Sequence, residues 1–252
     1  MIEEVIIISQ QAGKEILSFY NDEIDVEQKD DNSPLTKADL AAHNLIYREL
    51  KKLTPDIPIL SEEGGIPDYE ERKLWEQYWL VDPLDGTKEF IKKNGEFTVN
   101  IALIRENEPV LGVVFIPAKN VTYFGELGKG SFKIENGKQK KIISKTPDLN
   151  KPVTVVSSRS HGSNDLEEKL SELGVTIGNN ISAGSSLKFC LVAEGSADIY
   201  PRFGPTMEWD TGAGDAVFRY SGEEIRYSPI RYNKENLLNE GFIIGLNGSV
   251  DK

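Results

Sequence analysis

The stretch WLVDPLDGTKEF, residues 79–90, runs from an apolar segment directly into two aspartates, a proline and a glycine. We expect a buried strand that ends at Asp82, a turn stiffened by Pro83, and a helix that begins next to Gly86, where a ligand can approach the backbone closely. The free N–H groups at the start of a helix attract phosphate, and Asp82 and Asp85 can face a divalent cation that touches the same phosphate. Two carboxylates about 4 Å apart repel each other by about 4 kcal/mol at a moderate dielectric, so the pair implies a cation or a bound proton. In isolation, the pattern is more typical of a solvated acidic turn.

The composition is that of an ordinary globular protein, with 252 residues of which 38% are hydrophobic and 28% are charged. No repeat or low-complexity tract interrupts the chain, so we expect residues 1–252 to form a single compact unit. Two lobes that share an interface are compatible with this length. The segment KTPDLNKP, residues 145–152, marks their boundary, which gives an N-terminal lobe of about residues 1–150 and a C-terminal lobe of about residues 151–252.

The charge excludes one class of partner and narrows the choice of metal. There are 29 basic and 41 acidic residues, and the resulting net charge of −12 argues against binding of a nucleic acid polymer. Two histidines, His43 and His161, and one cysteine, Cys190, are too few for an ordinary zinc site. A bound metal should therefore have oxygen ligands, which favours magnesium, manganese or calcium.

The N-terminal segment indicates where the protein resides. Its only apolar run, residues 5–8, is short and follows Glu3 and Glu4, so it lacks the basic start and long apolar stretch of a signal peptide. No segment of the sequence approaches the length of a transmembrane helix. We expect a cytoplasmic protein in which Cys190, surrounded by apolar residues, is a buried and inert thiol.

Hydrophobic spacing and turn residues predict a mixture of helices and strands. Helices are expected over residues 2–20, 36–53, 164–174 and 185–195, and strands over residues 57–60, 78–81, 97–104, 110–117, 121–127 and 153–158. Strands 97–104 and 110–117 should form an antiparallel pair, with 121–127 beside them. Because helices and strands alternate throughout, the expected class is α+β or layered α/β.

Helix 36–53 is expected to bury a stripe of leucines and to begin with a capping arrangement. The stripe consists of Leu40, Leu45, Leu50 and Leu53. At the N-terminus, Thr36 stands three residues before Asp39, which is the spacing of a capping pair.

Several motifs together resemble a known superfamily. They are LSEEGG at 60–65, WLVDPLDGTKEF at 79–90, GEFTVNIALI at 95–104, SAGSSLKFCLVAEGSADIYPRFGPT at 182–206 and EWDTGAGDAV at 208–217. In this order they are similar to the lithium-sensitive, magnesium-dependent phosphatases that include the inositol monophosphatases, and most closely to the 3′(2′),5′-bisphosphate nucleotidase branch of the sulfur-assimilation type. The resemblance covers most of the chain, and it implies a layered α/β/α/β/α sandwich with the active site between the two lobes.

The resemblance implies roles for individual residues. The metal ligands for two or three Mg²⁺ ions would be Glu62, Asp82, the carbonyl of Leu84, Asp85 and Asp210, with a third, weaker ion near Glu62. Gly86 and Thr87 would contact the departing phosphate, and Asp39 and Thr87 would position and deprotonate the attacking water. Read singly, Glu62 is also typical of an exposed acidic turn, Asp210 of a helix N-cap, and Asp39 of a helix start.

Substrate-binding candidates come from the second half of the chain. By resemblance, Ser158 and His161 would contact a nucleotide. Gly184 and Ser185 precede a helix that carries Lys188, an arrangement suited to a second anionic group, and Arg202 suits a second phosphate better than the acidic residue typical of inositol monophosphatases. Two departures from the family pattern, Gly212 in place of alanine and Asp215 in place of histidine, follow the metal ligand and should change helix packing or local charge. Read singly, His161, Lys188 and Arg202 are also typical of solvated surface residues.

These observations predict a magnesium-dependent phosphatase that removes the 3′-phosphate of adenosine 3′,5′-bisphosphate to give AMP and phosphate, and that also accepts the sulfated parent nucleotide. The expected partner is a small phosphorylated nucleotide, and the expected state is a monomer or homodimer. Alternatives on the same scaffold are an inositol monophosphatase or a sugar-bisphosphate phosphatase. From other classes, a metal-dependent nucleotide sensor without turnover and a structural calcium module remain open.

Overall fold

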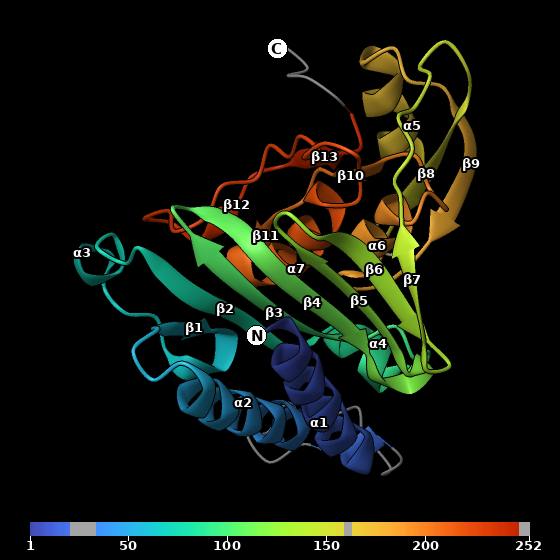
Figure 1. Cartoon of the computed structure of the whole chain (residues 1–252). Helices are drawn as coiled ribbons and strands as arrows, with labels where there is room; N and C mark the ends of the chain where they lie inside the picture. Colours follow the sequence, from blue (N-terminus) through green and yellow to red (C-terminus); the bar gives the residue numbers. More distant parts are fainter. Residues whose placement is uncertain (21–33, 159–162, 247–252) are drawn as a thin grey trace.

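A twisted sheet forms the centre of the molecule (Figure 1). The computed structural model describes residues 1–20, 34–158 and 163–246. The sheet has seven strands in the order β1-β2-β3-β4-β5-β6-β7, with β1 parallel to β2 and every other pair antiparallel. The strands are β1 (Ile59–Ser61), β2 (Gln77–Asp85), β3 (Thr98–Arg105), β4 (Glu108–Ile116), β5 (Val121–Glu126), β6 (Gly130–Glu135) and β7 (Lys138–Ile142). The predicted antiparallel pair and its third strand are confirmed as β3, β4 and β5.

Two long helices, α1 (Ile2–Tyr20) and α2 (Pro34–Leu53), cover one face of this sheet (Figure 1). The buried side of α2 consists of residues spaced by four, which places them one above another on a helix: Ala38, Ala42, Ile46 and Leu50. The predicted leucine stripe was wrong at Leu40, which is 40% exposed. None of the helices in the described ranges is long and apolar enough to cross a membrane.

Helix α2 begins earlier than the capping arrangement predicted. Its first residue is Pro34, so Thr36 lies inside the first turn and is not the residue that precedes the helix. Proline suits the first turn of a helix because its missing N–H group has no acceptor there. The structural reading of Asp39 as the partner of an N-capping Thr36 is therefore wrong.

The opposite face of the sheet is covered by α7 (Glu208–Arg219), with α6 (Leu187–Ala193) beside it (Figure 1). Helix α7 can approach closely because glycines stand below it. A Cβ on Gly112 of β4 would lie 2.5 Å from the carbonyl oxygen of Ala213, and one on Gly125 of β5 would lie 2.6 Å from that of Ala216. The core between α7 and the sheet joins residues from both halves of the chain.

The two departures in α7 have packing consequences, as expected. A Cβ on Gly212 would lie 2.9 Å from Cδ2 of Leu80, so glycine lets the helix approach the sheet. Asp215 is fully buried; its Oδ2 is 3.0 Å from Nε of Arg219 and accepts a hydrogen bond of 2.9 Å from the hydroxyl of Tyr232. A buried charge requires such partners, so Asp215 serves the interior of the fold.

The remaining elements are short, and some of them lie near α1, α2 and β2 while the others extend beyond α6 and α7 (Figure 1). They are the short helices α3 (Tyr69–Arg72), α4 (Thr87–Ile91) and α5 (Ser163–Glu172), the 3₁₀ turns η1 (Glu62–Gly64) and η2 (Pro117–Lys119), the parallel pair β8 (Val153–Ser157) and β9 (Ile177–Ser182), and the antiparallel pairs β10 (Tyr200–Arg202) with β13 (Phe242–Ile244) and β11 (Thr206–Met207) with β12 (Leu238–Asn239). Helix α5 lies outermost, against β8 and β9 (Figure 1). The predicted layered α+β fold is confirmed, whereas its division into two lobes stays a prediction.

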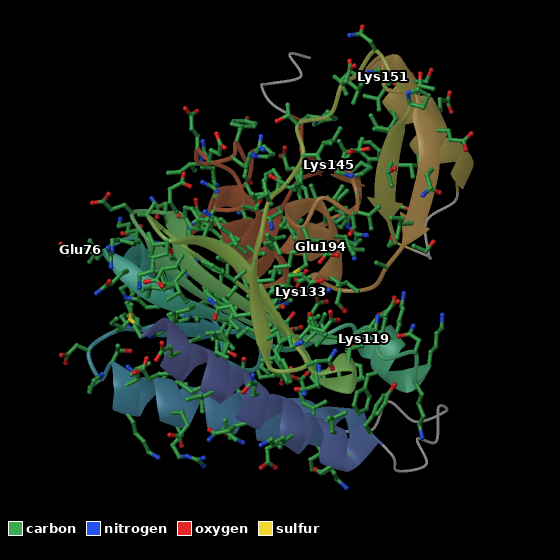
Figure 2. All side chains as sticks on the ribbon, turned by 45° about the vertical axis from the view of Figure 1, so that its right-hand side comes forward. Glu76, Lys119, Lys133, Lys145, Lys151 and Glu194 are labelled. Carbon is green, nitrogen blue, oxygen red and sulfur yellow. The ribbon has the colours of Figure 1, made fainter. Side chains whose placement is uncertain are left out.

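A polar contact joins strands β5 and β6 of the sheet to the end of α6. Glu194 follows α6, and its Oε2 accepts a hydrogen bond of 2.9 Å from the hydroxyl of Tyr123 on β5. The same oxygen lies 3.4 Å from Nζ of Lys133 on β6, and the two labelled residues are neighbours in Figure 2. Cys190 lies in the same helix α6 and is fully buried, as predicted.

A second junction fixes the beginning of α7. Glu208 is fully buried, and its carboxylate accepts hydrogen bonds from the backbone N–H groups of Asn233 at 2.7 Å and Lys234 at 3.0 Å. Nζ of Lys234 lies 2.7 Å from the same carboxylate. From α3, the buried guanidinium of Arg72 donates to Oδ1 of Asn233 at 3.0 Å and to the carbonyl of Lys234 at 3.2 Å. The first turn of α7 is thus held by a segment that follows it in sequence.

Candidate active site

An open pocket of about 200 Å³ lies where β2 ends, between the turn that follows it, the beginning of α6, strand β10 and the beginning of α7. Eight predicted site residues line it: Asp85, Gly86, Ser158, Gly184, Ser185, Lys188, Arg202 and Asp210. Five others, Asp39, Glu62, Asp82, Leu84 and Thr87, are not among the lining residues, and His161 falls outside the described residues.

Strand β2 runs on to Asp85, so the predicted end at Asp82 with a turn at Pro83 is wrong, and an irregularity in strand pairing takes the place of that turn. Pairing with β3 shifts register between Asp82 and Asp85, and the N–H of Leu84 donates to Oδ1 of Asp82 at 3.0 Å. Gly86 then adopts a φ of 96°, and α4 begins at Thr87, whose side chain is exposed. A Cβ on Gly86 would overlap the hydroxyl of Ser185, so this position requires glycine for both its φ and its close approach to α6.

The acidic residues near this turn lie close enough to influence one another. Burial and the charges of Asp85, Glu62 and Asp210 raise the pKa of Asp82 far above its ordinary value. The pKa of Asp210 is raised to about 7 by burial and by the charge of Asp85. Burial raises the pKa of Glu62 most, and the charges of Glu63 and Asp85 raise it further. A hydrogen bond with Asp82 lowers it in part. A hydrogen bond between two carboxyl groups requires that one of them carries a proton. A bound proton is, besides a cation, one of the two ways in which the repulsion between carboxylates was expected to be relieved.

Asp39 of α2 belongs to the same electrostatic cluster. Burial, the charges of Glu63 and Glu62, and a hydrogen bond to Glu63 raise its pKa to about 8. Its Oδ1 is buried and has no hydrogen-bond partner. A buried acceptor without a partner costs free energy unless a ligand or water supplies one. Asp39 therefore has the environment of a functional carboxyl group.

The donors in this cluster suit a hard divalent cation, since they are carboxylate and carbonyl oxygens. In residues 1–20, 34–158 and 163–246, however, no three acidic, histidine or cysteine side chains are gathered so that they could hold an ion as they stand. Individual hydrogen bonds direct them elsewhere, because Oδ2 of Asp210 accepts the N–H of Met207 at 2.8 Å. Mutual repulsion explains why carboxylates without a cation stay apart. The residues thus fit a cation in their chemistry and proximity but need small side-chain movements to enclose it.

Asp210 does not occupy the N-cap position that the structural reading of the sequence assigned to it. Met207 is the N-cap of α7, and Asp210 is the third residue of the helix. Its carboxylate reaches back to the Met207 N–H, which is the second half of a capping box.

Two basic side chains, Lys188 and Arg202, also line the pocket. Their charges reach its carboxylates, since Lys188 lowers the pKa of Asp85 and Arg202 lowers that of Asp210. Lys188 is 6% exposed, its Nζ donates to the carbonyl of Ser185 at 2.6 Å, and it lies 5.4 Å above the ring centre of Tyr200. Burial lowers the pKa of Lys188 to about 8. Arg202 donates through Nη2 to the carbonyl of Pro205 at 3.1 Å, and its Nε is buried without a partner. An unpaired guanidinium N–H at the pocket is suited to an anionic acceptor.

Ser185 forms part of the pocket wall. Its hydroxyl lies 2.9 Å from the carbonyl oxygen of Asp85 and 2.7 Å from that of Glu96, and its φ of 49° is unusual for a residue with a side chain. Oε2 of Glu96 accepts the N–H of Gly184 at 3.0 Å, while Oε1 lies 3.7 Å from Nζ of Lys119, which Figure 2 places near α4. The single hydroxyl proton of Ser185 is therefore engaged by backbone oxygens of the turn before β3.

Sequence reasoning missed several residues at the site. Asn100 and Ser186 contact Asp85, and His43, one turn after Asp39 on α2, has its Nδ1 2.9 Å from Oγ of Ser61, next to Glu62. Other lining residues that were not predicted are Lys88, Glu89, Phe189, Tyr200, Thr206 and Thr211. One signal was present in the sequence, because Asn100 interrupts the otherwise apolar stretch VNIALI.

Comparison with known proteins is consistent along the whole chain. The model of the inositol monophosphatase family matches residues 1–238. The 3′(2′),5′-bisphosphate nucleotidase CysQ of Escherichia coli (strain K12) is 49% identical over 252 residues, which covers 98% of this chain and 100% of that protein. CysQ of Haemophilus influenzae is 36% identical, with 97% of this chain and 92% of that protein covered.

Solved structures agree with this assignment. The crystal structure of CysQ from Bacteroides thetaiotaomicron, described as a bacterial member of the inositol monophosphatase family, superposes with a TM-score of 0.78 at 43% identity and covers 96% of this chain and 95% of that one. An inositol monophosphatase from Staphylococcus aureus shares the fold, with a TM-score of 0.74 at 21% identity over 97% of this chain and 91% of that one. The chain therefore belongs to the inositol monophosphatase family.

Proposed function

We propose that this chain is a 3′(2′),5′-bisphosphate nucleotidase that removes the 3′-phosphate of adenosine 3′,5′-bisphosphate to give AMP and phosphate. It is a hydrolase of a metal-dependent family, and relatives that carry this activity in their name match it over nearly its full length at about half identity. The observation that carries the proposal is the pocket, whose lining brings together two carboxylates, Asp85 and Asp210, called its acidic end below, and two cations, Lys188 and Arg202, called its basic end. Such a pocket suits a substrate with two phosphate groups, one near metal ions and one near cations of the protein.

The acidic end would hold magnesium, as two or three ions. The proposed ligands are Glu62, Asp82, the carbonyl of Leu84, Asp85 and Asp210. When bound, the ions would lower the pKa of a water molecule, orient it towards phosphorus and neutralise charge on the leaving oxygen. The buried, mutually charged surroundings of Asp82 support this assignment, because a divalent cation removes the repulsion that raises its pKa.

Asp39 and Thr87 would act on the water molecule. Burial and the charges of Glu63 and Glu62 raise the pKa of Asp39, and a carboxyl group with a raised pKa is a stronger proton acceptor once it is deprotonated, as a general base requires. Thr87 begins α4 with an exposed hydroxyl, which would orient the water towards Asp39. Gly86 would let the departing phosphate approach the backbone, because no side chain intervenes.

The basic end would choose the substrate. Lys188 and Arg202 would bind the 5′-phosphate, and Ser158 would contact the nucleoside from the end of β8. His161, assigned to the nucleoside from sequence, lies outside the described residues. Gly184 and Ser185 would shape the wall between the two ends. An inositol phosphate offers hydroxyl groups where this end offers cations, so a bisphosphate is the better match.

The direct test is phosphate release from adenosine 3′,5′-bisphosphate and from inositol 1-phosphate, each measured with magnesium, with a chelator and with lithium added to magnesium. We expect release from the bisphosphate in magnesium, none in chelator, and inhibition by lithium. An Asp39→Asn variant is the matched control, since it should still bind the nucleotide but release little phosphate.

The outcomes separate the alternatives. Equal or faster turnover of inositol 1-phosphate would make the protein an inositol monophosphatase. Tight nucleotide binding without phosphate release would make it a sensor. Raised thermal stability in calcium without any nucleotide effect would make it a structural calcium module. A cytoplasmic location and a monomeric or homodimeric state stay predictions, to be checked by cell fractionation and light scattering.

A further inference from the structure

A single hydroxyl group connects the two halves of the acidic cluster. Ser186 is 2% exposed and stands directly before α6, yet its side chain makes no capping bond to that helix. Its Oγ lies 2.7 Å from the carbonyl oxygen of Asp210 on α7, 3.2 Å from Oδ2 of Asp85 on β2, and 3.0 Å from Nδ2 of Asn100 on β3. Strands β2 and β3 and helix α7 therefore meet at one atom.

The donors and acceptors around the Oγ atom of Ser186 can be assigned from their chemistry. A hydroxyl has one proton and two lone pairs, whereas an amide nitrogen has two protons and donates only. Asn100 therefore donates to Ser186, and Ser186 donates towards Asp210 and Asp85. Nδ2 of Asn100 also lies 3.4 Å from Oδ2 of Asp85. Both side chains contact the same oxygen of Asp85, which restrains the position of that oxygen.

We propose that Ser186 is a positioning residue that holds Asp85 and Asp210 at the separation and orientation needed to share a cation. The inference rests on the proposed metal site. Asp210 is restrained from both sides, because its carbonyl accepts from Ser186 and its carboxylate accepts the Met207 N–H. Asp85 is restrained by Ser186 and Asn100. Without the Ser186 hydroxyl, the direct link between Asp85 and the Asp210 backbone would be lost, while Asp85 would keep its bonds to Asn100 and to the Ser186 backbone N–H. The two carboxylates would then be less closely aligned.

A supporting role of this kind differs measurably from a purely structural one. Loss of a partner around a metal ligand typically costs about 10- to 100-fold in metal affinity or activity. A buried serine that only joins two elements costs stability but leaves the affinity for an ion unchanged. The chain offers such a serine in Ser131 of β6, which is fully buried and donates to the carbonyl of Val217 on the same helix α7 at 2.6 Å.

The experiment is titration calorimetry of the full chain with magnesium alone, in the absence of substrate, on the natural protein, Ser186→Ala and Ser131→Ala. Thermal melting in chelator is recorded for each. We expect both variants to lose stability in chelator, and only Ser186→Ala to bind magnesium at least about 10-fold more weakly. Ser186→Cys, which keeps the volume but has a weak donor, should also bind magnesium more weakly, and it carries the test if the alanine variant does not fold.

Each result has a definite meaning. Magnesium affinity of the Ser186 variants within twofold of the natural protein would overturn the inference, while the proposed metal site would stand. Equal loss of affinity in Ser131→Ala would also overturn it, because the effect would then be a general consequence of loosening α7. If the natural protein itself bound no magnesium, the proposed function would fail first.

Discussion

The two ends of the pocket carry opposite charges and differ in what they lack. At the acidic end, burial raises the pKa values of Asp82, Asp85 and Asp210, and the charge of Asp85 raises those of Asp82 and Asp210 further. The charge of Lys188 and hydrogen bonds from Ser186 and Asn100 offset this rise at Asp85. At the basic end, Lys188 also has a carbonyl and an aromatic ring as partners. A bound cation would therefore relieve the acidic end, which is the metal site proposed above, whereas Lys188 already has partners within the protein.

The largest effect should come from removing one charge at the acidic end. Asp82→Asn keeps an oxygen for the Leu84 N–H but removes a negative charge. Loss of a residue that only supports a metal ligand costs up to about 100-fold in activity. Because Asp82 is proposed as a ligand itself, we expect kcat/KM for adenosine 3′,5′-bisphosphate to fall by at least about 100-fold. In chelator, by contrast, the melting temperature should stay the same or rise, because a source of repulsion is gone.

Phosphate release and thermal melting check both parts. Asp148→Asn is the matched control, since Asp148 is an exposed aspartate paired with Lys151 and should change neither quantity appreciably. If Asp82→Asn lost stability in chelator and kept its activity, the contrast between the two ends would be wrong.

The next effect concerns the basic end. Arg202→Glu replaces a donor to the second phosphate by a repelling charge. Hydrogen bonds to charged groups are worth about 1.5–3 kcal/mol, so kcat/KM for the bisphosphate should fall by about 10- to 150-fold. Turnover of inositol 1-phosphate should fall less. Magnesium affinity should not fall, because the charge of Arg202 acts on Asp210 and its reversal favours a cation there.

Steady-state kinetics on both substrates measure this change. Arg105→Glu, at the exposed far end of β3, controls for a general change of charge. An unchanged ratio of the two specificities in Arg202→Glu would show that Arg202 does not read the second phosphate.

The smallest effect is the pH dependence of stability without metal. The raised pKa values, about 8 for Asp39 and about 7 for Asp210 against 3.8 ordinarily, mean that the folded protein binds more protons than the unfolded one between about pH 4 and 8. Stability in chelator should therefore be highest at the acidic side of this window and fall as pH rises through it. The lowered pKa of Lys188, about 8 against 10.5, acts with the opposite sign only above this window.

Melting curves from pH 5 to 8 in chelator should show a fall of at least about 2–4 °C, which corresponds to about 1 kcal/mol for a chain of this size. Asp39→Asn should make the slope shallower, and magnesium should reduce or abolish it. A melting temperature that rises with pH in chelator would contradict the account of the acidic end.

The sequence predicted the fold where periodicity was strong. The spacing of apolar residues is a local signal, and it was sufficient to predict helices α1 and α2 and strands β3, β4 and β5. The buried face of α2 was misread because small residues, Ala38 and Ala42, mark it, and leucines seemed the better core formers. Strand β7 was not predicted, since four of its five residues are exposed and polar and its pairing depends on β6.

The site was predictable in its chemistry but less so in its supporting contacts. Asp85, Lys188, Arg202 and Asp210 do line one pocket. What the motifs could not reveal is the function of uncharged residues, because a serine such as Ser186 acquires its role only when three elements converge on it. Likewise, nothing in the sequence indicates that the hydroxyl of Ser185 faces two backbone oxygens.

The junction at Glu208 has a consequence for the order of events during synthesis. The carboxylate of Glu208 is fully buried only because Asn233 and Lys234 supply its donors, and both leave the ribosome well after α7 itself. Until they arrive, the helix that carries Asp210 has a charged group with no buried partner and is better left in water. A nascent chain stalled before Asn233 would thus contain most of the site residues without a docked α7. The complete site would form only late in synthesis, when this segment has been made.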